Sequence, residues 1–373
     1  MFESAGSDPS FIRRIEGYAD NEETGLVVGK SDPEVVLEGP AAQIWEMAEY
    51  ATTIAAMCER LAVNFTVDPS VCVRETTATI ADLERRGLME RCPAPNPIRD
   101  RYLWLLKRAL VNLIYTEDEQ RLWLLSGTAG PPPEPPTQEH LRDIRYADPE
   151  GYAYLRRAKR VGTVIHNQPG RYSHTMIGLQ GLTAIERFAE DLFRQGVPGD
   201  FVDAGTCRGG AAILMRAMQT AFGESRRLVW VADSFTGVPA STSEVDVAAG
   251  LDLTTARYPW LAASLEMVRD NFRTYDLLDE QVRFLPGLFA DTLPEAPIGQ
   301  IALLRLDADL YSSTFEALSA LYDRVADGGV VIVDDYGGIK ACRRAVDTFR
   351  EERRITTPLQ RINWTEVWWR KHA

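Results

Sequence analysis

A glycine-rich turn follows the first short apolar run in the second half of the chain. It reads Asp203-Ala-Gly205-Thr-Cys-Arg-Gly209-Gly210, with a strand predicted before it and a helix predicted over residues 211–222. Glycines at such a turn let the backbone approach a ligand closely, and the helix start offers free N–H groups. The spacing D-x-G-x-x-x-G differs from the G-x-G-x-x-G of dinucleotide sites. Its leading acid suits a ligand with a cationic ammonium or sulfonium group, whereas the alternative is a purely structural tight turn.

A second acid strengthens the ligand-binding interpretation. Asp233 ends the next apolar run, thirty residues after Asp203. In doubly wound folds, an acid at this place accepts hydrogen bonds from ribose hydroxyls. We therefore favour a binding turn over a merely structural one.

Four further acids close the fourth and fifth apolar runs. Asp307 and Asp309 end LLRLDADLY, and Asp334 and Asp335 end VVIVDDY. If these strands are neighbours, their carboxylates converge and raise one another's pKa unless a cation neutralises them. Oxygen ligands favour Mg²⁺. Alternatively, Asp309 only caps the following helix and Asp335 only closes a turn.

The elements that must position these residues alternate between strand and helix. Short apolar runs cover residues 201–205, 227–233, 282–287, 301–307 and 329–335, and amphipathic segments such as 264–275 and 313–325 separate them. This alternation predicts a parallel sheet with helices on both faces. The last two runs, 359–362 and 367–370, are too close for a helical crossover and predict an antiparallel hairpin at the sheet edge. The expected fold is α/β, Rossmann-like and doubly wound.

The first ninety residues form a separate module. Two β-branched runs, 12–18 and 25–37, predict a strand pair or triplet, and three helices should begin near Pro40, Ile54 and Pro69. Asp68 is the expected cap of the third helix, which should stop at Gly87. Strands followed by three helices predict a small winged-helix-like α+β domain. We place domains at 1–92 and 99–373, joined by the linker PAPNPI at 93–98.

Composition excludes several classes of protein. The 373 residues are 45% hydrophobic and 25% charged, as in soluble globular proteins, and no apolar window approaches the roughly 20 residues that cross a bilayer. The start of the chain has no readable signal peptide, so a cytoplasmic location is expected. Five cysteines without a C-x-x-C pair predict reduced thiols. A net charge of −13 argues against nucleic acid as a partner.

The second domain resembles the macrocin O-methyltransferase family, whose members use S-adenosylmethionine and Mg²⁺. The resemblance covers residues 99–371 and rests on segments that include GVPGDFVDAGTCRGGAAILMRAM, LLRLDADLYSSTFEALSALYDRVADGGVVIVDDYGG and INWTEVWWR. It implies that Asp307 is the base and that the metal ligands are Asp307, Asp334 and Asp335. The cofactor-binding residues that it implies are Asp203, Gly205 and Gly209 for the methionine part, Asp233 and Ser234 for the ribose, and in addition Ser264 and Phe289.

Two departures from the family pattern affect the cofactor side only. Asp203 stands where glutamate is usual, and Thr206-Cys207 replaces the common Val-Trp. The shorter acid is expected to shift the contact with the cofactor's amino group. The residues that match the family's metal ligands are intact.

The first domain resembles the PqqD family, whose domains recognise leader peptides of ribosomally made, modified peptides. The resemblance rests on the segment from VVLEGPAAQIWEMAEY to ADLERRGLME. Residues 1–92 hold 8 Lys and Arg against 17 Asp and Glu, so DNA binding by a winged helix is disfavoured. A leader peptide added to an exposed strand within residues 25–37 is the better hypothesis. The alternative is a domain that serves only packing or dimerisation.

Three functions follow from these resemblances. The first is a methyltransferase that tailors a peptide held by the first domain. The second keeps the chemistry but acts on a sugar hydroxyl of a small-molecule natural product, and the third is a noncatalytic peptide carrier. The acids Asp307, Asp334 and Asp335 count against the third. We expect no membrane partner and a homo-oligomeric assembly.

Overall fold

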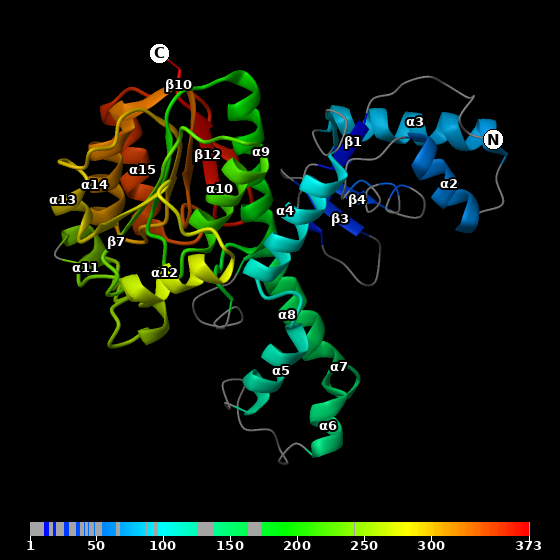
Figure 1. Cartoon of the computed structure of the whole chain (residues 1–373), viewed down its shortest axis with the longest axis horizontal. Coiled ribbons are helices and arrows are strands. Elements are labelled where there is room, and N and C mark those ends of the chain that lie inside the picture. The colour runs from blue at the N-terminus through cyan, green and yellow to red at the C-terminus, as the bar shows by residue number, and fades with distance from the viewer. Residues whose placement is uncertain are drawn as a thin grey trace. The chain divides into compact units, whose positions relative to one another are not determined.

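The chain forms two compact units, Met1–Tyr102 and Leu103–Ala373. The computed structural model (Figure 1) describes residues 11–14, 18–19, 26–29, 35–37, 41, 44, 48, 54–64, 68–86, 89–92, 96–125, 137–162, 173–241 and 243–372. The start of the helix expected near Pro40 and the proline tract at 131–136 lie outside the described residues.

The first unit combines two small sheets with two described helices. One sheet has the antiparallel order β2-β3-β4, and the other pairs β1 with β5. The elements are β1 (Phe11–Arg14), β2 (Tyr18–Ala19), β3 (Leu26–Gly29), β4 (Val35–Leu37), α2 (Ile54–Asn64), α3 (Pro69–Arg85) and β5 (Met89–Cys92). The strand triplet and both of these helices confirm the sequence prediction, whereas β5 was not predicted.

The start of α3 shows why this segment is helical. The carboxylate of Asp68 accepts hydrogen bonds from the backbone N–H groups of Ser70 and Val71, and Pro69 occupies the first helical position, where its missing N–H costs nothing. Buried apolar side chains of α2 and α3 then form the core of this unit. They include Met57, Cys58, Leu61, Ile80 and Leu83.

A seven-stranded sheet organises the second unit. Its order is β11-β12-β10-β9-β6-β7-β8, parallel from β10 to β8 and antiparallel where β12 pairs with β10 and β11. The strands are β6 (Asp200–Ala204), β7 (Val229–Asp233), β8 (Val282–Pro286), β9 (Ile301–Leu306), β10 (Val325–Val333), β11 (Gln360–Arg361) and β12 (Val367–Arg370). The predicted doubly wound sheet and its antiparallel hairpin are confirmed.

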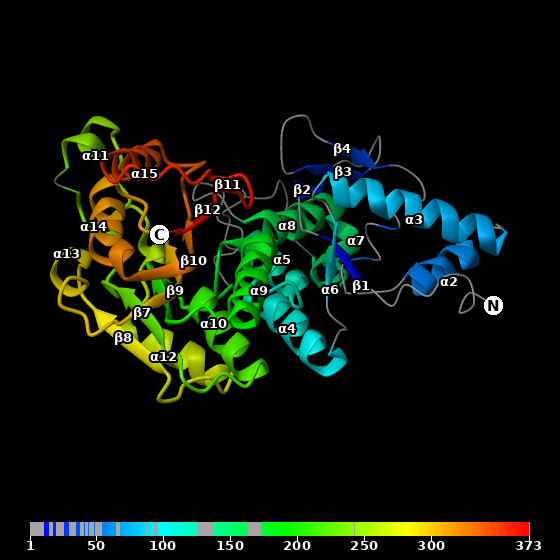
Figure 2. The same cartoon turned by 90° about the horizontal axis from the view of Figure 1, so that it is seen from above.

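Helices cover both faces of this sheet. Figures 1 and 2 show α9 (Gly178–Gln195) and α10 (Gly210–Ala221) on one face and α14 (Tyr311–Leu321) and α15 (Lys340–Glu352) on the other. Each face has its own buried core, one around α9 and α10 and one around α14 and α15. The remaining elements between the strands are α11 (Glu244–Ala248), η1 (Pro259–Leu261), α12 (Leu265–Thr274), α13 (Phe289–Thr292) and η2 (Tyr322–Arg324).

A group of helices precedes the sheet. These are α4 (Pro97–Leu110), α5 (Thr116–Leu125), α6 (Gln138–Arg142), α7 (Ile144–Ala147) and α8 (Pro149–Val161). A buried ion pair between Lys159 and Glu119 joins α8 to α5, and the same ammonium donates to the carbonyl of Val111. Helix α4 starts at Pro97, inside the predicted linker, because proline is tolerated at the first helical position. Among the described residues, no helix combines the length and apolar character needed to span a membrane.

Candidate active site

A cavity of about 460 Å³ lies at the carboxyl ends of the central strands. The strand order reverses between β6 and β9, and ligands of open α/β sheets bind at such a switch point. Its walls come from the glycine turn, the ends of β7, β9 and β10, the start of α14, the segment before α9 and the segment between β11 and β12. The residues that line it include Thr175, Gly205, Cys207, Asp233, Ser234, Ser241, Phe289, Arg305, Asp307, Asp309, Ser312, Asp334 and Asp335.

The turn after β6 and the turn after β9 are in direct backbone contact. Gly205 has a φ of 90°, and a Cβ atom there would lie 1.8 Å from the carbonyl oxygen of Asp307. Only glycine fits such an approach. The turn therefore brings the predicted cofactor residue Gly205 beside the predicted base Asp307.

Asp233 fixes the same turn from the end of β7. Its Oδ2 accepts hydrogen bonds from the backbone N–H groups of Thr206 (2.9 Å) and Cys207 (3.1 Å), and its Oδ1 accepts from that of Phe235 (2.8 Å). Burial raises the pKa of this carboxyl, although the three backbone donors oppose that shift. The hydroxyl of Ser234 beside it donates to the carbonyl of Gly237 at 2.7 Å.

The predicted cofactor-binding residues divide into two groups. Gly205, Asp233, Ser234 and Phe289 line the cavity, whereas Asp203, Gly209 and Ser264 are absent from its lining. Their cofactor contacts stay predictions.

Each residue of the second group has a structural task. Asp203 is fully buried, where it accepts a hydrogen bond from the hydroxyl of Thr206. Gly209 is the N-cap of α10, with a φ of 88°. Ser264 is the N-cap of α12, where its hydroxyl accepts a hydrogen bond from the N–H of Met267.

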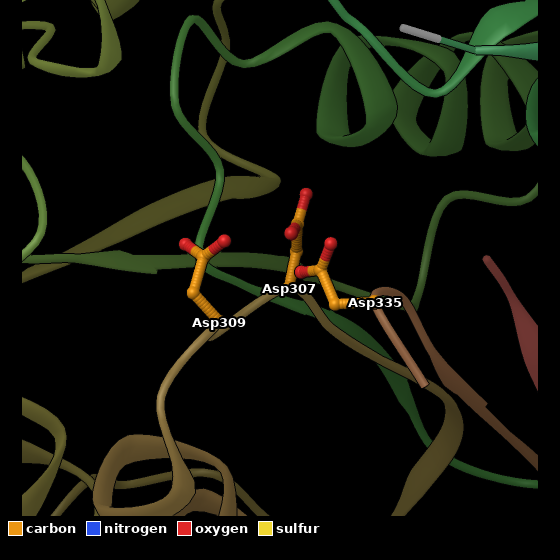
Figure 3. Close-up of side chains that lie close together, drawn as sticks. All are labelled: Asp307, Asp309 and Asp335. Atoms are coloured by element: carbon orange, nitrogen blue, oxygen red, sulfur yellow. The ribbon is translucent and has the colours of Figure 1, made fainter. Parts of the chain in front are cut away.

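Three carboxylates converge at the ends of β9 and β10. One oxygen each of Asp307, Asp309 and Asp335 lies within 4.8 Å of the others, and their side chains point in the same direction (Figure 3). Asp309 and Asp335 both have a φ of 56°, a left-handed conformation that L-residues other than asparagine and aspartate seldom adopt. Two left-handed aspartates thus lie where the acids meet.

The charges of this cluster are poorly compensated. Burial, with the neighbouring Asp307 and Asp334 charges, raises the pKa of Asp309 to about 8, and burial with the Asp309 charge raises the pKa of Asp335 well above its ordinary value. The Oδ2 atom of Asp335 is buried and receives no hydrogen bond from the described residues. Such an arrangement suits a divalent cation with oxygen ligands.

Asp334 is the member of the predicted metal set that lies outside the three-carboxylate cluster, and like Asp307 it contacts Arg305. Its Oδ2 lies 2.9 Å from Nη2 of Arg305, and its Oδ1 accepts from the N–H of Asp335. Burial and the Asp307 charge raise its pKa to about 7, against the lowering effect of Arg305. The predicted set therefore has Asp307 and Asp335 in the cluster, while Asp309 is the third member in space and Asp334 lies against an arginine.

Arg305 is a site residue that our sequence analysis missed. It lies on the central strand β9, and its side chain is 2% exposed. Its guanidinium contacts Asp203 at 2.9 Å, Asp307 at 2.8 Å and Asp334 at 2.9 Å. The available signal was a charged residue inside the apolar run IALLRLD, since a fully buried arginine requires partners.

One wall of the cavity is clamped by Arg208. Its Nη1 donates to the carbonyl of Ser173 (2.6 Å) and its Nη2 to that of Trp260 (3.2 Å). Nearby, the Nδ1 of His174 lies 2.6 Å from the hydroxyl of Tyr275. These contacts fix the segment 173–177 before α9, which contributes Thr175, Met176 and Ile177 to the lining.

Another part of the cavity wall depends on a buried acid of α11. Asp246 is fully buried and accepts hydrogen bonds from the hydroxyl of Ser241 (2.6 Å) and the N–H of Tyr311 (2.8 Å). It ties the segment before α11 to the first turn of α14. Both Ser241 and Ser312 face the cavity beside this contact.

The sheet order and the place of the cavity assign the chain to the S-adenosylmethionine-dependent methyltransferases. Within that class it belongs to the macrocin O-methyltransferase (TylF) family, which matches residues 99–371. Residues 31–89 match the family described as coenzyme PQQ synthesis protein D (PqqD). The chain is therefore an O-methyltransferase that uses S-adenosylmethionine, with a PqqD-like segment at its N-terminal side.

Named relatives support this assignment. The chain is 42% identical over 278 residues to the 8-demethyl-8-(2,3-dimethoxy-alpha-L-rhamnosyl)-tetracenomycin-C 4'-O-methyltransferase of Streptomyces olivaceus, covering 74% of this chain and 94% of the relative. It is 49% identical over 200 residues to the demethyldecarbamoylnovobiocin O-methyltransferase of Streptomyces niveus (53% and 76%). It is 42% identical over 204 residues to the mycinamicin III 3''-O-methyltransferase of Micromonospora griseorubida (54% and 80%).

A solved structure shows the same fold. The structure of the O-methyltransferase NovP is similar to this chain with a TM-score of 0.59 and 38% sequence identity. The similarity covers 74% of this chain and all of that one. The predicted fold class and the predicted enzyme class are confirmed.

Proposed function

We propose that this enzyme methylates a sugar hydroxyl of a small-molecule natural product, with a divalent metal at Asp307, Asp309 and Asp335. The observation that carries the proposal is the single cavity that joins the glycine turn and Asp233 to this carboxylate cluster. The names of the relatives, which include a rhamnosyl 4'-O-methyltransferase and a 3''-O-methyltransferase, support a sugar acceptor. They favour the small-molecule alternative over peptide tailoring.

The chemistry needs a hydroxyl, a base and a sulfonium methyl in line. An O–CH₃ bond forms while the S–CH₃ bond breaks, so the cofactor leaves as a neutral thioether and the hydroxyl proton passes to a base. A divalent metal, when bound, lowers the pKa of the acceptor hydroxyl. We assign the proton to the carboxylate of Asp307, which lines the cavity and is 26% exposed.

Two features of the chain orient this base. Arg305 contacts Oδ2 of Asp307 at 2.8 Å and restricts the rotation of the carboxylate. The N–H of Asp307 donates to the carbonyl of Ala204 at 2.8 Å and holds the strand end against the glycine turn. The same backbone contact therefore positions both Asp307 and the glycine turn.

The fit of a metal rests on the donor chemistry of the cluster. All three groups are carboxylates, and one oxygen of Asp335 is buried without a hydrogen-bond donor in the part of the chain that the structure describes. Hard oxygen donors suit Mg²⁺, which keeps several exchangeable waters. The predicted fourth acid, Asp334, is the candidate for a further ligand if Arg305 releases it.

The test is methyl transfer to a panel of glycosides with free deoxysugar hydroxyls, followed by mass spectrometry. We expect one added methyl group on a sugar oxygen, dependent on added Mg²⁺ and abolished by excess EDTA. Transfer only to aglycone hydroxyls would contradict the acceptor class. Full turnover in EDTA would contradict the metal.

The match of residues 31–89 favours a second candidate, a peptide bound by the first unit. Among the described strands, β4 is bonded to β3 on one side only, and an extended peptide pairs with such an edge. The predicted edge within residues 25–37 therefore falls on β4, since β3 is the central strand. We expect the full chain to bind a labelled precursor leader in fluorescence anisotropy. If no precursor leader binds while glycosides are still methylated, the peptide candidate is wrong and only the small-molecule function stands.

A further inference from the structure

We propose that Arg305 is a built-in counter-cation, a positioning residue that assembles the metal-binding carboxylates before a metal binds. The inference rests on the proposed metal site. Its basis is one buried guanidinium that contacts three carboxylates, Asp203, Asp307 and Asp334, at 2.8 to 2.9 Å. Asp307 belongs to the proposed metal site, and Asp334 is its candidate further ligand.

The strand register explains how one side chain reaches all three acids. On β6 and β9, Asp203 is the direct neighbour of Arg305. Asp307 follows two residues after Arg305, so both project to the same face of the strand. The N–H of Asp334 donates to the carbonyl of Leu306, which brings the end of β10 alongside. Three neighbouring strands therefore each contribute one acid to this arginine.

The surroundings of Arg305 demand a cation. Asp203 and Glu366 are almost fully buried, and Glu366 also interacts electrostatically with the guanidinium. Carboxylates gathered in a dry interior repel one another, and the loss of their hydration is costly unless a positive charge compensates them. A planar guanidinium is suited to this task because its fork of donors engages several carboxylates at once, which a single ammonium cannot reproduce.

One arginine does not neutralise the whole group. Asp309 and Asp335 belong to the cluster, and no contact between either side chain and Arg305 is found among the described residues. The guanidinium thus compensates the charges of Asp307 and Asp334. The charges of Asp309 and Asp335, which line the cavity, stay uncompensated by this arginine. We infer that this division preserves attraction for a metal and fixes Asp307 and Asp334 in advance.

The experiment compares Mn²⁺ binding, followed by electron paramagnetic resonance, in the full wild-type chain and in Arg305→Lys. Lysine keeps the charge but loses the fork, so electrostatic attraction for the metal is little changed while ligand orientation is lost. We expect Mn²⁺ affinity to fall about 10- to 100-fold, the usual effect of removing a partner that orients metal ligands. We also expect Arg305→Lys to unfold at a lower temperature than wild type in EDTA.

A second variant keeps the test decisive if Arg305→Lys does not fold. Asp203→Asn removes the negative charge of one partner of the guanidinium without changing a proposed metal ligand, so more of the positive charge acts on Asp307 and Asp334. We expect several-fold weaker Mn²⁺ binding. Asp200→Asn on the same strand is the matched control, because Asp200 contacts Leu228 and Trp230 instead, and should bind Mn²⁺ as wild type does.

The outcomes separate this inference from the proposed function. Equal Mn²⁺ affinity in wild type, Arg305→Lys and Asp203→Asn would overturn the role of Arg305 and leave the metal site standing. No Mn²⁺ binding by wild type would refute the metal itself. In that case the unfolding measurements in EDTA decide, and an unchanged unfolding temperature of Arg305→Lys would overturn the counter-cation.

Discussion

At the scale of single residues, the acids of the cavity differ in what compensates them. Asp307 and Asp334 contact Arg305, and Asp233 accepts backbone hydrogen bonds, whereas one oxygen of Asp335 is buried and receives no hydrogen bond from any described residue. A buried carboxylate oxygen that lacks a donor is explained best by a ligand. Asp335 is therefore the most informative position to change.

We predict that Asp335→Asn lowers methyl transfer at least ~100-fold, because a metal that supplies several kcal/mol of stabilisation loses a charged ligand. The fold should survive, since the substitution removes a buried charge. Initial rates and the unfolding temperature are the measurements. The control is Asp323→Asn, which changes an aspartate in an exposed ion pair. An Asp335→Asn enzyme as active as wild type would contradict its place at the metal.

The pair of His174 and Tyr275 predicts a dependence of stability on pH. Burial and the nearby Arg208 charge lower the pKa of His174, and burial raises the pKa of Tyr275 to about 12, so the phenol stays protonated and can donate to the neutral imidazole. As the pH falls, the imidazole of His174 is therefore protonated at a higher pH in the unfolded chain than in the folded chain. The stability that neutral His174 contributes is lost as the pH falls below about 6.5.

The matching variant is His174→Gln, which keeps an acceptor but does not titrate. Between about pH 7 and about pH 5, the unfolding temperature of wild type should fall more steeply than that of the variant, measured in EDTA. Parallel curves would show that His174 does not titrate differently in the folded chain.

Sequence reasoning at the residue scale found the acids but not their partners. Acids at strand ends are visible because a polar residue interrupts an apolar run, as at Asp233 and Asp307. The three-way contact of Arg305 depends on the register between neighbouring strands, which no local pattern reports. The choice between Asp309 and Asp334 in the cluster likewise depends on a left-handed backbone at Asp309.

At the scale of elements, periodicity predicted the sheet well. The apolar runs became β6 to β10, and amphipathic segments became α12 and α14, each within a few residues of the expected ends. Helix α4 ends at Leu110, and the left-handed backbone of Asn112 (φ of 55°) follows it, which no periodic pattern indicates. The pairing of β1 with β5 was missed because it joins strands about 75 residues apart, and single-sequence patterns carry no such information.

Arg208 gives a prediction at this scale because it joins two segments of the cavity wall. Replacing its guanidinium by methionine removes charge-assisted hydrogen bonds to the carbonyls of Ser173 and Trp260. Each is worth roughly 1.5–3 kcal/mol. We expect Arg208→Met to bind S-adenosylhomocysteine at least ~10-fold more weakly in calorimetry.

The control is Arg353→Met, which breaks an exposed ion pair between Arg353, directly after α15, and Asp323 in η2, and which should bind the ligand normally. If both variants bind as wild type does, the wall does not depend on Arg208. If both weaken equally, the effect is a general loss of stability.

At the scale of the whole molecule, two units have separate cores, one on α2 and α3 and the others on the two faces of the seven-stranded sheet. We predict two unfolding transitions in calorimetry. Saturating S-adenosylhomocysteine should raise the temperature of the larger transition only, because a ligand stabilises the unit that binds it. A single transition that shifts as a whole would show that the units unfold together.

The position of β12 in the sheet has a consequence for the order of events during synthesis. This strand comes after all other described strands in sequence, yet it lies between β11 and β10, and its Trp369 is fully buried. When the ribosome has already synthesised the glycine turn and the acids of the cavity, the outer edge of β10 is still unpaired. It stays exposed until Val367–Arg370 leave the ribosome. An apolar strand edge that is exposed during this time can pair with the wrong strand. Pairing of β12 with β10 therefore removes this risk of aggregation.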